Sequence, residues 1–188
     1  MKSIAVFCGS RLGSDPVYKA SAAALGREIA SSGRTLVYGG SNVGTMGRLA
    51  DAALEAGGEV IGVIPDKLVE REIAHPSLSK LYKVSTMHER KAKMAELADG
   101  FIALPGGPGT LEEFFEMFTW AQIGVHQKPC ALLNINHYYD HLLQFFNHME
   151  QEHFLPADHR DKIIVSDTPE ELLQQLSENP ELEKKSYE

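Results

Sequence analysis

The chain has 188 residues, of which 43% are hydrophobic and 23% are charged, values typical of one globular domain with a sizeable core. The formal net charge of −8 argues against a nucleic-acid-binding protein, because such proteins neutralise phosphates with a clustered basic surface. The apolar stretch after Lys2 has the length of a strand rather than of a signal peptide, and no apolar run reaches the roughly 20 residues that cross a bilayer. We therefore expect a cytoplasmic protein that binds neither nucleic acid nor a membrane.

Short apolar runs of strand length alternate with longer helical patterns along the whole chain. The predicted strands are Ile4–Cys8, Thr35–Tyr38, Val60–Ile64, Leu81–Val84, Phe101–Leu104, Cys130–Asn134 and Ile163–Val165. The predicted helices are Val17–Ser31, Thr45–Ala56, His88–Ala98, Thr110–Ile123, Tyr139–Glu152 and Pro169–Leu176. This alternation predicts an α/β fold, with a Rossmann-like, doubly wound, mostly parallel sheet of about seven strands and helices on both faces. We expect residues 1–188 to form a single Rossmann-like nucleotide-binding domain, with a flexible polar tail after about residue 179.

Ligands of such folds collect at the carboxyl ends of the strands, so the residues that follow each predicted strand are informative. The first strand ends in Cys8-Gly9-Ser10-Arg11. Gly9 and Ser10 are candidates to hold a phosphate or ribose oxygen, and Arg11 adds a positive charge. A tight turn with a solvated arginine explains the same residues without a ligand, and the sequence leaves both interpretations open.

A longer glycine-rich segment, Gly39-Gly40-Ser41-Asn42-Val43-Gly44-Thr45-Met46-Gly47, follows the second predicted strand. Its glycines let backbone amides approach an anion closely, and the next helix offers its positive N-terminal end. The segment matches neither a Walker A loop nor the G-x-G-x-x-G dinucleotide pattern. Gly39, Gly40 and Gly44 are therefore secondary candidates for contact with a nucleotide.

Two basic residues, Arg90 and Lys91, stand near the start of the helix that follows the fourth predicted strand. Cations are unfavourable there, because a helix N-terminus carries a partial positive charge. An anionic ligand that faces Arg90 and Lys91 explains the placement. A solvated basic patch paired with Glu89 or Glu96 explains it equally well.

The most informative segment is Pro105-Gly106-Gly107-Pro108-Gly109-Thr110-Leu111-Glu112-Glu113, which follows the strand Phe101–Leu104. A glycine cradle at the start of a helix presents free amide donors to a phosphate, and Thr110 adds its hydroxyl. Glu112 and Glu113 are each favourable near the helix N-terminus for electrostatic reasons alone. A carboxylate that faces the cradle would also lie beside a bound sugar, where the helix dipole keeps it ionised and able to activate water.

The rest of this helix and the histidines that follow are expected to be structural. The residues spaced as one core-facing stripe are Leu111, Phe114, Phe115, Phe118 and Gln122. His137 and His141 have a spacing that occurs in zinc sites, but no cysteine or carboxylate completes a tetrad, so we predict no metal site.

These segments together identify a family. The run Pro105–Glu113 resembles the PGGxGTxxE signature of the LONELY GUY (LOG) family, and Arg90-Lys91 matches the arginine–lysine pair upstream of that signature. The stretches Met87–Met94 and Trp120–Gly124 also look like family sequence. The similarity extends from Ile4 to about Leu176, nearly the whole chain.

The resemblance implies a cytokinin riboside 5′-monophosphate phosphoribohydrolase. Such an enzyme splits an N6-modified adenosine monophosphate, and often AMP, into the free base and ribose 5-phosphate, and it requires neither a metal nor an organic cofactor. The resemblance also implies a homodimer with the site near the subunit interface. Family members are often labelled lysine decarboxylases, but no Schiff-base lysine with supporting groups for pyridoxal phosphate stands out in this chain.

Carried over position by position, Arg90 and Glu113 match the catalytic residues of the family. The residues that match its substrate-binding positions are Glu72, Arg90, Lys91, Gly106, Gly107, Pro108, Gly109, Thr110, Leu111, Glu112, Glu113 and Thr119. In the mechanism that this implies, a carboxylate stabilises the positive charge that develops on the ribose, as in glycoside hydrolases. Glu113 has this role and Glu112 is the second candidate, because helix position alone does not separate them. Arg90 positions the phosphosugar or assists departure of the base.

Two other functions would use the same features. A non-catalytic nucleotide-sensing module would bind through the same cradle without turnover. An AMP nucleosidase with no cytokinin role would prefer unmodified AMP. The presence of both Arg90 and Glu113 favours catalysis over sensing.

Overall fold

The computed structural model describes residues 1–69 and 73–178, in which seven strands form one sheet. The strands are β1 (Ser3–Phe7), β2 (Thr35–Tyr38), β3 (Val60–Pro65), β4 (Lys80–Val84), β5 (Gly100–Ala103), β6 (Cys130–Leu133) and β7 (Ile163–Ser166). Their order in the sheet is β4-β3-β2-β1-β5-β6-β7, and every neighbouring pair is parallel. The predicted α/β fold is confirmed, and each predicted strand agrees with the structure to within one residue at either end.

Six longer helices match the six that the sequence predicts. They are α1 (Pro16–Ser31), α2 (Gly44–Glu55), α4 (Met87–Leu97), α5 (Pro108–Gln122), α6 (Asp140–Gln151) and α8 (Pro169–Glu178). Three short elements were not predicted, namely α3 (Asp66–Val69), the 3₁₀ turn η1 (Ile135–His137) and α7 (Ala157–Arg160). Single turns of this kind are too short to show a hydrophobic period, so the sequence pattern does not reveal them.

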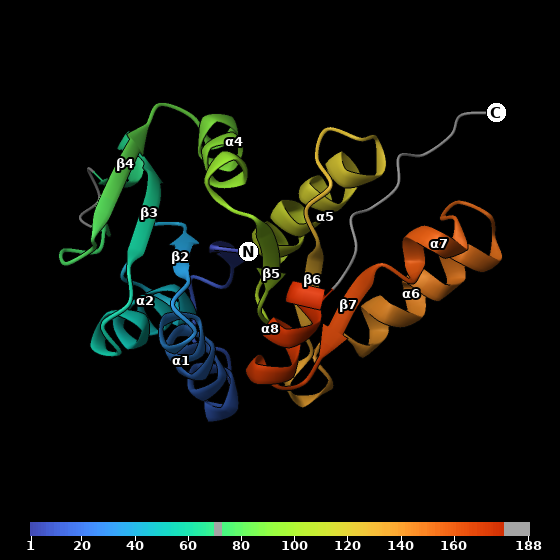
Figure 1. Ribbon diagram of the computed structural model, residues 1–188, viewed down its shortest axis with the longest axis horizontal. Helices are drawn as coiled ribbons and strands as arrows, with labels where there is room; N and C mark the ends of the chain where they lie inside the picture. The colour runs from blue at the N-terminus through green and yellow to red at the C-terminus, as the bar shows by residue number, and fades with distance from the viewer. Residues whose placement is uncertain (70–72, 179–188) are drawn as a thin grey trace.

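The helices cover the sheet on both faces, with α1, α2 and α8 on one side and α4, α5 and α6 on the other (Figure 1). Side chains alternate along each strand, so β1 contributes Ile4 and Val6 to the first core and Ala5 and Phe7 to the second. Burial on both faces explains why the central strands are continuous apolar runs in the sequence.

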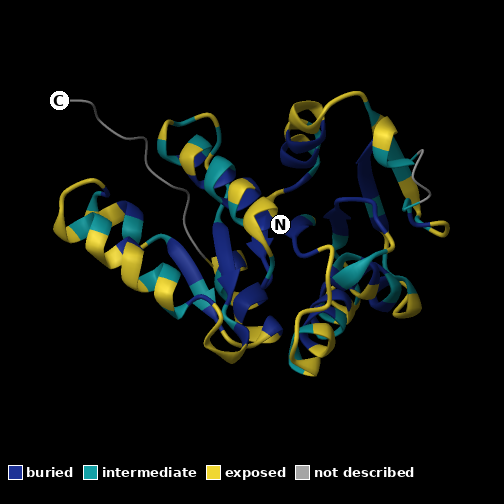
Figure 2. Ribbon diagram, turned by 180° about the vertical axis from the view of Figure 1, so that it is seen from behind, coloured by how far each residue is buried: buried dark blue, intermediate teal, exposed yellow. Residues whose placement is uncertain are grey.

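The edge strand β4 departs from this pattern. Lys80 and Lys83 are exposed and the other residues of β4 are only partly buried, whereas β5 and β6 are buried throughout (Figure 2). Charged residues on an edge strand discourage pairing with another chain, which is a common way to protect a sheet edge. The sheet is therefore less fully covered at β4 than at its centre.

The order of the strands creates a crevice at the carboxyl ends of β1 and β5. After β1 the chain builds the sheet outward through β2, β3 and β4, and it then returns to place β5 on the other side of β1. The loops that leave β1 and β5 consequently turn in opposite directions, and ligands bind at such a switch in strand order. In the part of the chain that the structure describes, no helix is long and apolar enough to cross a bilayer.

Candidate active site

Two adjoining cavities open at this switch point. The first has a volume of about 280 Å³, and we call it the Glu113 cavity. Its lining residues are Cys8, Gly9, Ser10, Met46, Met87, Arg90, Gly107, Pro108, Gly109, Thr110, Glu112 and Glu113. The topology therefore brings together the segments after β1, β4 and β5 that the sequence singled out.

Cys8 is the one thiol in the lining of the Glu113 cavity. Burial raises the pKa of Cys8 to about 12, and a hydrogen bond with Thr45 only partly offsets this. The thiol is therefore protonated at neutral pH, whereas a cysteine nucleophile acts as the thiolate. Cys8 contributes packing to the cavity wall.

Helix α5 begins at the cavity with a glycine cradle. Gly107 is the N-cap, and Pro108 occupies the first turn, where its missing N–H is not needed. A β-carbon at Gly107 or Gly109 would meet nothing within 4 Å, so the backbone faces open space at both positions. Gly106 has no such freedom, because a β-carbon there would lie 2.1 Å from the Thr110 hydroxyl oxygen. The cradle thus has an open backbone at Gly107 and Gly109, whereas Gly106 packs closely against Thr110.

Arg90 reaches the cavity from α4 and is 8% exposed. Its Nη1 donates a hydrogen bond to Glu113 Oε1 at 3.0 Å, and its Nε donates to the Val63 carbonyl at 3.1 Å. Gly39 leaves the space for this side chain, since a β-carbon at Gly39 would lie 1.9 Å from Arg90 Nη2. The guanidinium is therefore held by β3, α5 and the loop after β2 at once.

The structure separates the two candidate carboxylates. Glu113 is 7% exposed and lies on the buried face of α5, while Glu112 is exposed. Burial raises the pKa of Glu113 above its ordinary value, and the Arg90 guanidinium opposes this. From the sequence we expected only the effect of the helix dipole, which favours a low pKa for a carboxyl group. Burial, which has the largest effect on the pKa of Glu113, was missed. Only burial beside a paired cation distinguishes Glu113 from its neighbour.

Lys91 stands next to Arg90 in the sequence but makes different contacts. Its side chain is 5% exposed, and its ammonium group lies between the carboxylates of Glu112 and Glu116, the latter at 3.0 Å. Burial favours a lower pKa for Lys91, but the hydrogen bonds and charges of the two glutamates outweigh it, so the pKa is raised. Lys91 is thus a charged link between α4 and α5. Contact between Lys91 and a nucleotide stays a prediction.

The glycine-rich segment after β2 makes contacts that hold other segments of the site in place. The amide of Thr45 and its hydroxyl both donate to the Gly9 carbonyl, at 3.1 and 3.0 Å, so the start of α2 is tied to the loop after β1. The Gly40 carbonyl accepts from the His75 amide at 2.9 Å. These contacts, together with the space that Gly39 leaves for Arg90, account for the segment structurally. Contact of Gly39, Gly40 and Gly44 with a nucleotide stays a prediction.

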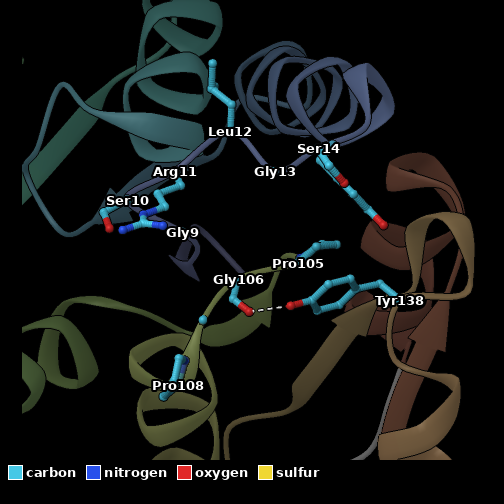
Figure 3. A pocket seen from close by; sticks show the side chains of 12 residues that line it. Gly9, Ser10, Arg11, Leu12, Gly13, Ser14, Pro105, Gly106, Pro108 and Tyr138 are labelled. Carbon is cyan, nitrogen blue, oxygen red and sulfur yellow. Dashed lines mark hydrogen bonds between the residues drawn. The ribbon is translucent and has the colours of Figure 1, made fainter.

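The second cavity, of about 490 Å³, lies on the other side of the cradle (Figure 3), and we call it the Arg11 cavity. Its lining residues are Gly9, Ser10, Arg11, Leu12, Gly13, Ser14, Tyr18, Pro105, Gly106, Gly107, Pro108 and Tyr138. Gly9, Ser10, Gly107 and Pro108 line both cavities. The two cavities therefore meet at the start of α5.

Tyr138 is a member of this wall that the sequence did not reveal. Its hydroxyl donates to the Gly106 carbonyl at 2.6 Å (Figure 3). Its ring meets that of Tyr18 edge to face. The contact joins residues that are 32 positions apart. An aromatic residue in a loop after a strand carries no signal for such a contact, so there was no means to find it from the sequence.

Other predicted residues lie outside the two cavities. Thr119 is exposed on α5, ten residues after Gly109 and thus about 15 Å further along the helix. Leu111 is partly buried and packs against the core. Glu72 lies outside the described residues, as does the predicted tail after residue 179. Substrate contacts by these residues stay predictions.

Two structural expectations can be compared with the fold. On α5 the buried face consists of Thr110, Glu113, Phe114, Met117, Phe118 and Ala121. The predicted stripe is confirmed at Phe114 and Phe118, which are buried, and Leu111 and Phe115 are partly buried and pack against the same core. The prediction did not include Met117 and Ala121, which are buried on this face of α5. His137 lies 3.2 Å from an Asp140 carboxylate oxygen, and among the described residues no group of three or more His, Cys, Asp or Glu is arranged to hold a metal ion.

Comparisons with known proteins point to one family. A family model described as "Possible lysine decarboxylase" matches residues 46–176. The cytokinin riboside 5′-monophosphate phosphoribohydrolase of Rhodococcoides fascians is 52% identical over 165 residues, which cover 87% of this chain and 83% of that protein. The enzyme of the same name from Oryza sativa, LOG, is 46% identical over 177 residues, covering 94% of this chain and 73% of the rice protein.

Solved structures with the same fold are more distant in sequence. The molybdenum cofactor binding protein from Rippkaea orientalis superposes with a TM-score of 0.72 at 25% identity, covering 94% of this chain and 96% of that one. The molybdenum cofactor carrier protein from Chlamydomonas reinhardtii has a TM-score of 0.71 at 21% identity, covering 95% and 99%. The second likeness concerns the fold alone.

Proposed function

Because the chain belongs to the LOG family of cytokinin riboside 5′-monophosphate phosphoribohydrolases, we propose that it hydrolyses the N-glycosidic bond of N6-modified adenosine 5′-monophosphates. Water supplies a hydroxyl to C1′ of the ribose and a proton to the base. The C1′–N9 bond breaks, and the products are a free cytokinin base and ribose 5-phosphate. The reaction requires a group that stabilises positive charge on the sugar and a site that holds the phosphate.

The observation that carries the assignment of residues is the buried Arg90–Glu113 pair beside the glycine cradle. Breaking an N-glycosidic bond builds positive charge on the ribose, and a nearby carboxylate stabilises that charge. We assign this role to Glu113, which lines the cavity and also orients the attacking water. Arg90 holds the carboxylate at 3.0 Å, so its orientation is set before substrate arrives.

The cradle provides binding energy away from the bond that breaks. The open backbone at Gly107 and Gly109, with the N-terminal end of α5 behind it, suits the 5′-phosphate. Interactions with such a remote group help to place C1′ beside Glu113. The cradle and the carboxylate therefore act on opposite ends of the same phosphoribosyl group.

The same geometry argues against a lysine decarboxylase that uses Lys91. A Schiff-base lysine must lose its proton to react, which burial in an apolar pocket favours. Lys91 instead lies between Glu112 and Glu116, and these carboxylates raise its pKa and stabilise the ammonium form. A lysine decarboxylase activity, which the name of the matching family suggests, therefore does not fit the lysine that stands beside the site.

The decisive experiment follows the products. Wild-type protein is incubated with AMP and with isopentenyladenosine 5′-monophosphate, and free base is separated by chromatography, with Glu113→Gln alongside. Release of base by wild type and not by the variant is the expected result. Faster turnover of the prenylated substrate would point to cytokinin production, and a preference for AMP would indicate a general AMP nucleosidase.

A second candidate function is binding without turnover. It is favoured by the superposition on a cofactor-binding protein at 25% identity, because that neighbour shows that the fold also serves binding proteins. In that case both nucleotides would bind and stay intact, and Glu113→Gln would bind them as wild type does. Assembly as a homodimer and a cytoplasmic location stay predictions; sedimentation of the purified protein tests the first of these.

A further inference from the structure

The two cavities differ in charge. The Glu113 cavity is lined by one cation, Arg90, and two carboxylates, Glu112 and Glu113. The lining of the Arg11 cavity contains no acidic residue, and Arg11 is its only charged side chain. A phosphate monoester carries close to two negative charges at neutral pH, so the Arg11 cavity offers it a cation without the two carboxylates that line the Glu113 cavity.

Arg90 and Lys91 are already paired with carboxylates. Arg90 pairs with Glu113 at 3.0 Å, and Lys91 lies between Glu112 and Glu116. Within residues 1–69 and 73–178, by contrast, the Arg11 side chain has neither an ion-pair nor a hydrogen-bond partner. Of the two cations that line these cavities, Arg90 is therefore paired and Arg11 is free to pair with an anionic ligand.

The position of Arg11 suits a ligand that spans both cavities. The cavities share Gly9, Ser10, Gly107 and Pro108, so a group bound at the cradle lies at their common border. Figure 3 shows the Ser10 and Arg11 side chains together on the wall of the Arg11 cavity, with Tyr138 on another part of the wall. A phosphate at Gly107 can thus meet Arg11 on one side while the ribose extends toward Glu113 on the other.

We propose that the Arg11 cavity is the subsite for the 5′-phosphate of the substrate and that Arg11 is the cation that recognises it. This inference rests on the proposed function and deepens it, because it sets the direction in which the nucleotide lies. The phosphate faces Arg11, C1′ lies beside Glu113, and the base extends toward Met46 and Met87, which also line the Glu113 cavity. Arg11 thereby selects nucleoside monophosphates over nucleosides.

A binding measurement tests the subsite without relying on turnover. Ribose 5-phosphate, inorganic phosphate and ribose are titrated into the full-length protein by calorimetry, using wild type, Arg11→Ala, Arg11→Lys and the control Arg27→Ala. Arg27 is exposed on α1, lines neither cavity, and its removal changes the net charge equally. We expect Arg11→Ala to weaken binding of ribose 5-phosphate by about ten- to a hundredfold, the loss of one charge-assisted contact.

The controls make each outcome decisive. Arg11→Lys should restore part of the affinity for ribose 5-phosphate, and Arg27→Ala should bind it as wild type does. The affinity for ribose should be the same in wild type and in all variants. If Arg11→Ala retains the affinity of wild type, or if wild type does not bind ribose 5-phosphate, the subsite is wrong. Base release from AMP is measured on the same samples: its absence in wild type, with Arg11-dependent binding intact, would overturn the enzymatic function and leave the phosphate subsite standing.

Discussion

Two neighbouring contacts between α4 and α5 look alike in the sequence and differ in the structure. Arg90 and Glu113 form a pair in which both side chains are buried and both line a cavity. Lys91 is equally buried, but of its two partners Glu112 is 56% exposed and Glu116 is 23% exposed, and Lys91 lines neither the Glu113 cavity nor the Arg11 cavity. Consecutive residues of a helix point about 100° apart, so adjacent cations face different surroundings.

A sequence motif therefore indicates which positions belong to a site, but it does not show what each side chain does there. The resemblance assigns both members of the Arg90-Lys91 pair to the substrate. The geometry places Arg90 at the cavity and Lys91 in ion pairs that join the two helices on which Arg90 and Glu113 stand. Substitutions in each contact should therefore affect catalysis and stability in different proportions.

The largest effect is expected from removing the charge of Glu113. Glu113→Gln keeps the shape of the side chain but cannot stabilise positive charge on the ribose, so the rate of base release from AMP should fall on the order of 10²- to 10⁴-fold. Glu112→Gln is the matched control from the other contact, and it should lose less than about tenfold. Equal losses in the rate of base release for Glu113→Gln and Glu112→Gln would contradict the different roles expected of the two glutamates.

Stability should separate the two cations. Arg90→Met leaves the buried Glu113 carboxylate without a partner, and breaking such a pair costs about 3–5 kcal/mol in the free energy of unfolding. Lys91→Met should cost less, about 1–3 kcal/mol, because the exposed Glu112 regains water. Urea denaturation followed by circular dichroism measures both values. A larger loss for Lys91→Met would contradict the comparison.

The pH dependence of kcat/KM connects the two contacts. Activity requires ionised Glu113, so it rises with pH through the pKa of this carboxyl group, which burial raises. The charge of Glu116 also raises that pKa and the charge of Lys91 lowers it. Glu116→Gln should therefore move the acid limb to lower pH and Lys91→Met should move it to higher pH, each by less than about one pH unit.

Displacements of the acid limb in opposite directions in these two variants would be specific to electrostatic coupling between the substituted charges and Glu113. A variant that merely loosened the packing of α4 on α5 would lower kcat at every pH and leave the position of the limb unchanged. Initial rates of base release between pH 4 and about pH 8, with AMP well below KM, give the profile. Displacements in the same direction for both variants would count against the coupling.

The smallest effect is expected at the solvent-exposed pair on α4. Lys93 and Glu96 lie 3.0 Å apart on one turn of the helix, with 28% and 67% of their side chains exposed. Pairs of this kind contribute less than about 1 kcal/mol, so Lys93→Ala should change the free energy of unfolding by about 0.5 kcal/mol or less. The rate of base release should equal that of wild type. A substantial loss of activity would extend the site to a face of α4 that we regard as structural.

The sequence predicted the regular elements well and the short ones poorly. The buried strands β1, β2 and β5 are continuous apolar runs, and that pattern depends only on local residues. The turns α3, η1 and α7 carry no period and were missed. The exposed residues of β4 were not distinguished either, because the pattern does not say which strand lies at an edge.

The segments that form the candidate site were identified from the sequence, whereas the contacts between them are seen only in the structure. Gly106–Glu113 and Arg90 were singled out because glycines and charges follow strands. The hydrogen bond from Tyr138 to Gly106 and the ion pairs of Lys91 join residues far apart in the chain. No local pattern encodes such contacts, which arise only when the strand order sets the loops beside one another.

By itself, the sequence determined the alternation of strands and helices, the glycine cradle at the start of a helix and the family to which they belong, because each is written in neighbouring residues. Only the tertiary structure distinguished the buried Glu113 from the exposed Glu112 and placed Arg90 and Lys91 in different surroundings. It also left Arg11 without a partner among the described residues, on the wall of its own cavity. The physical reason is that the charge and reactivity of a side chain depend on its burial and its partners. Segments distant along the chain supply both.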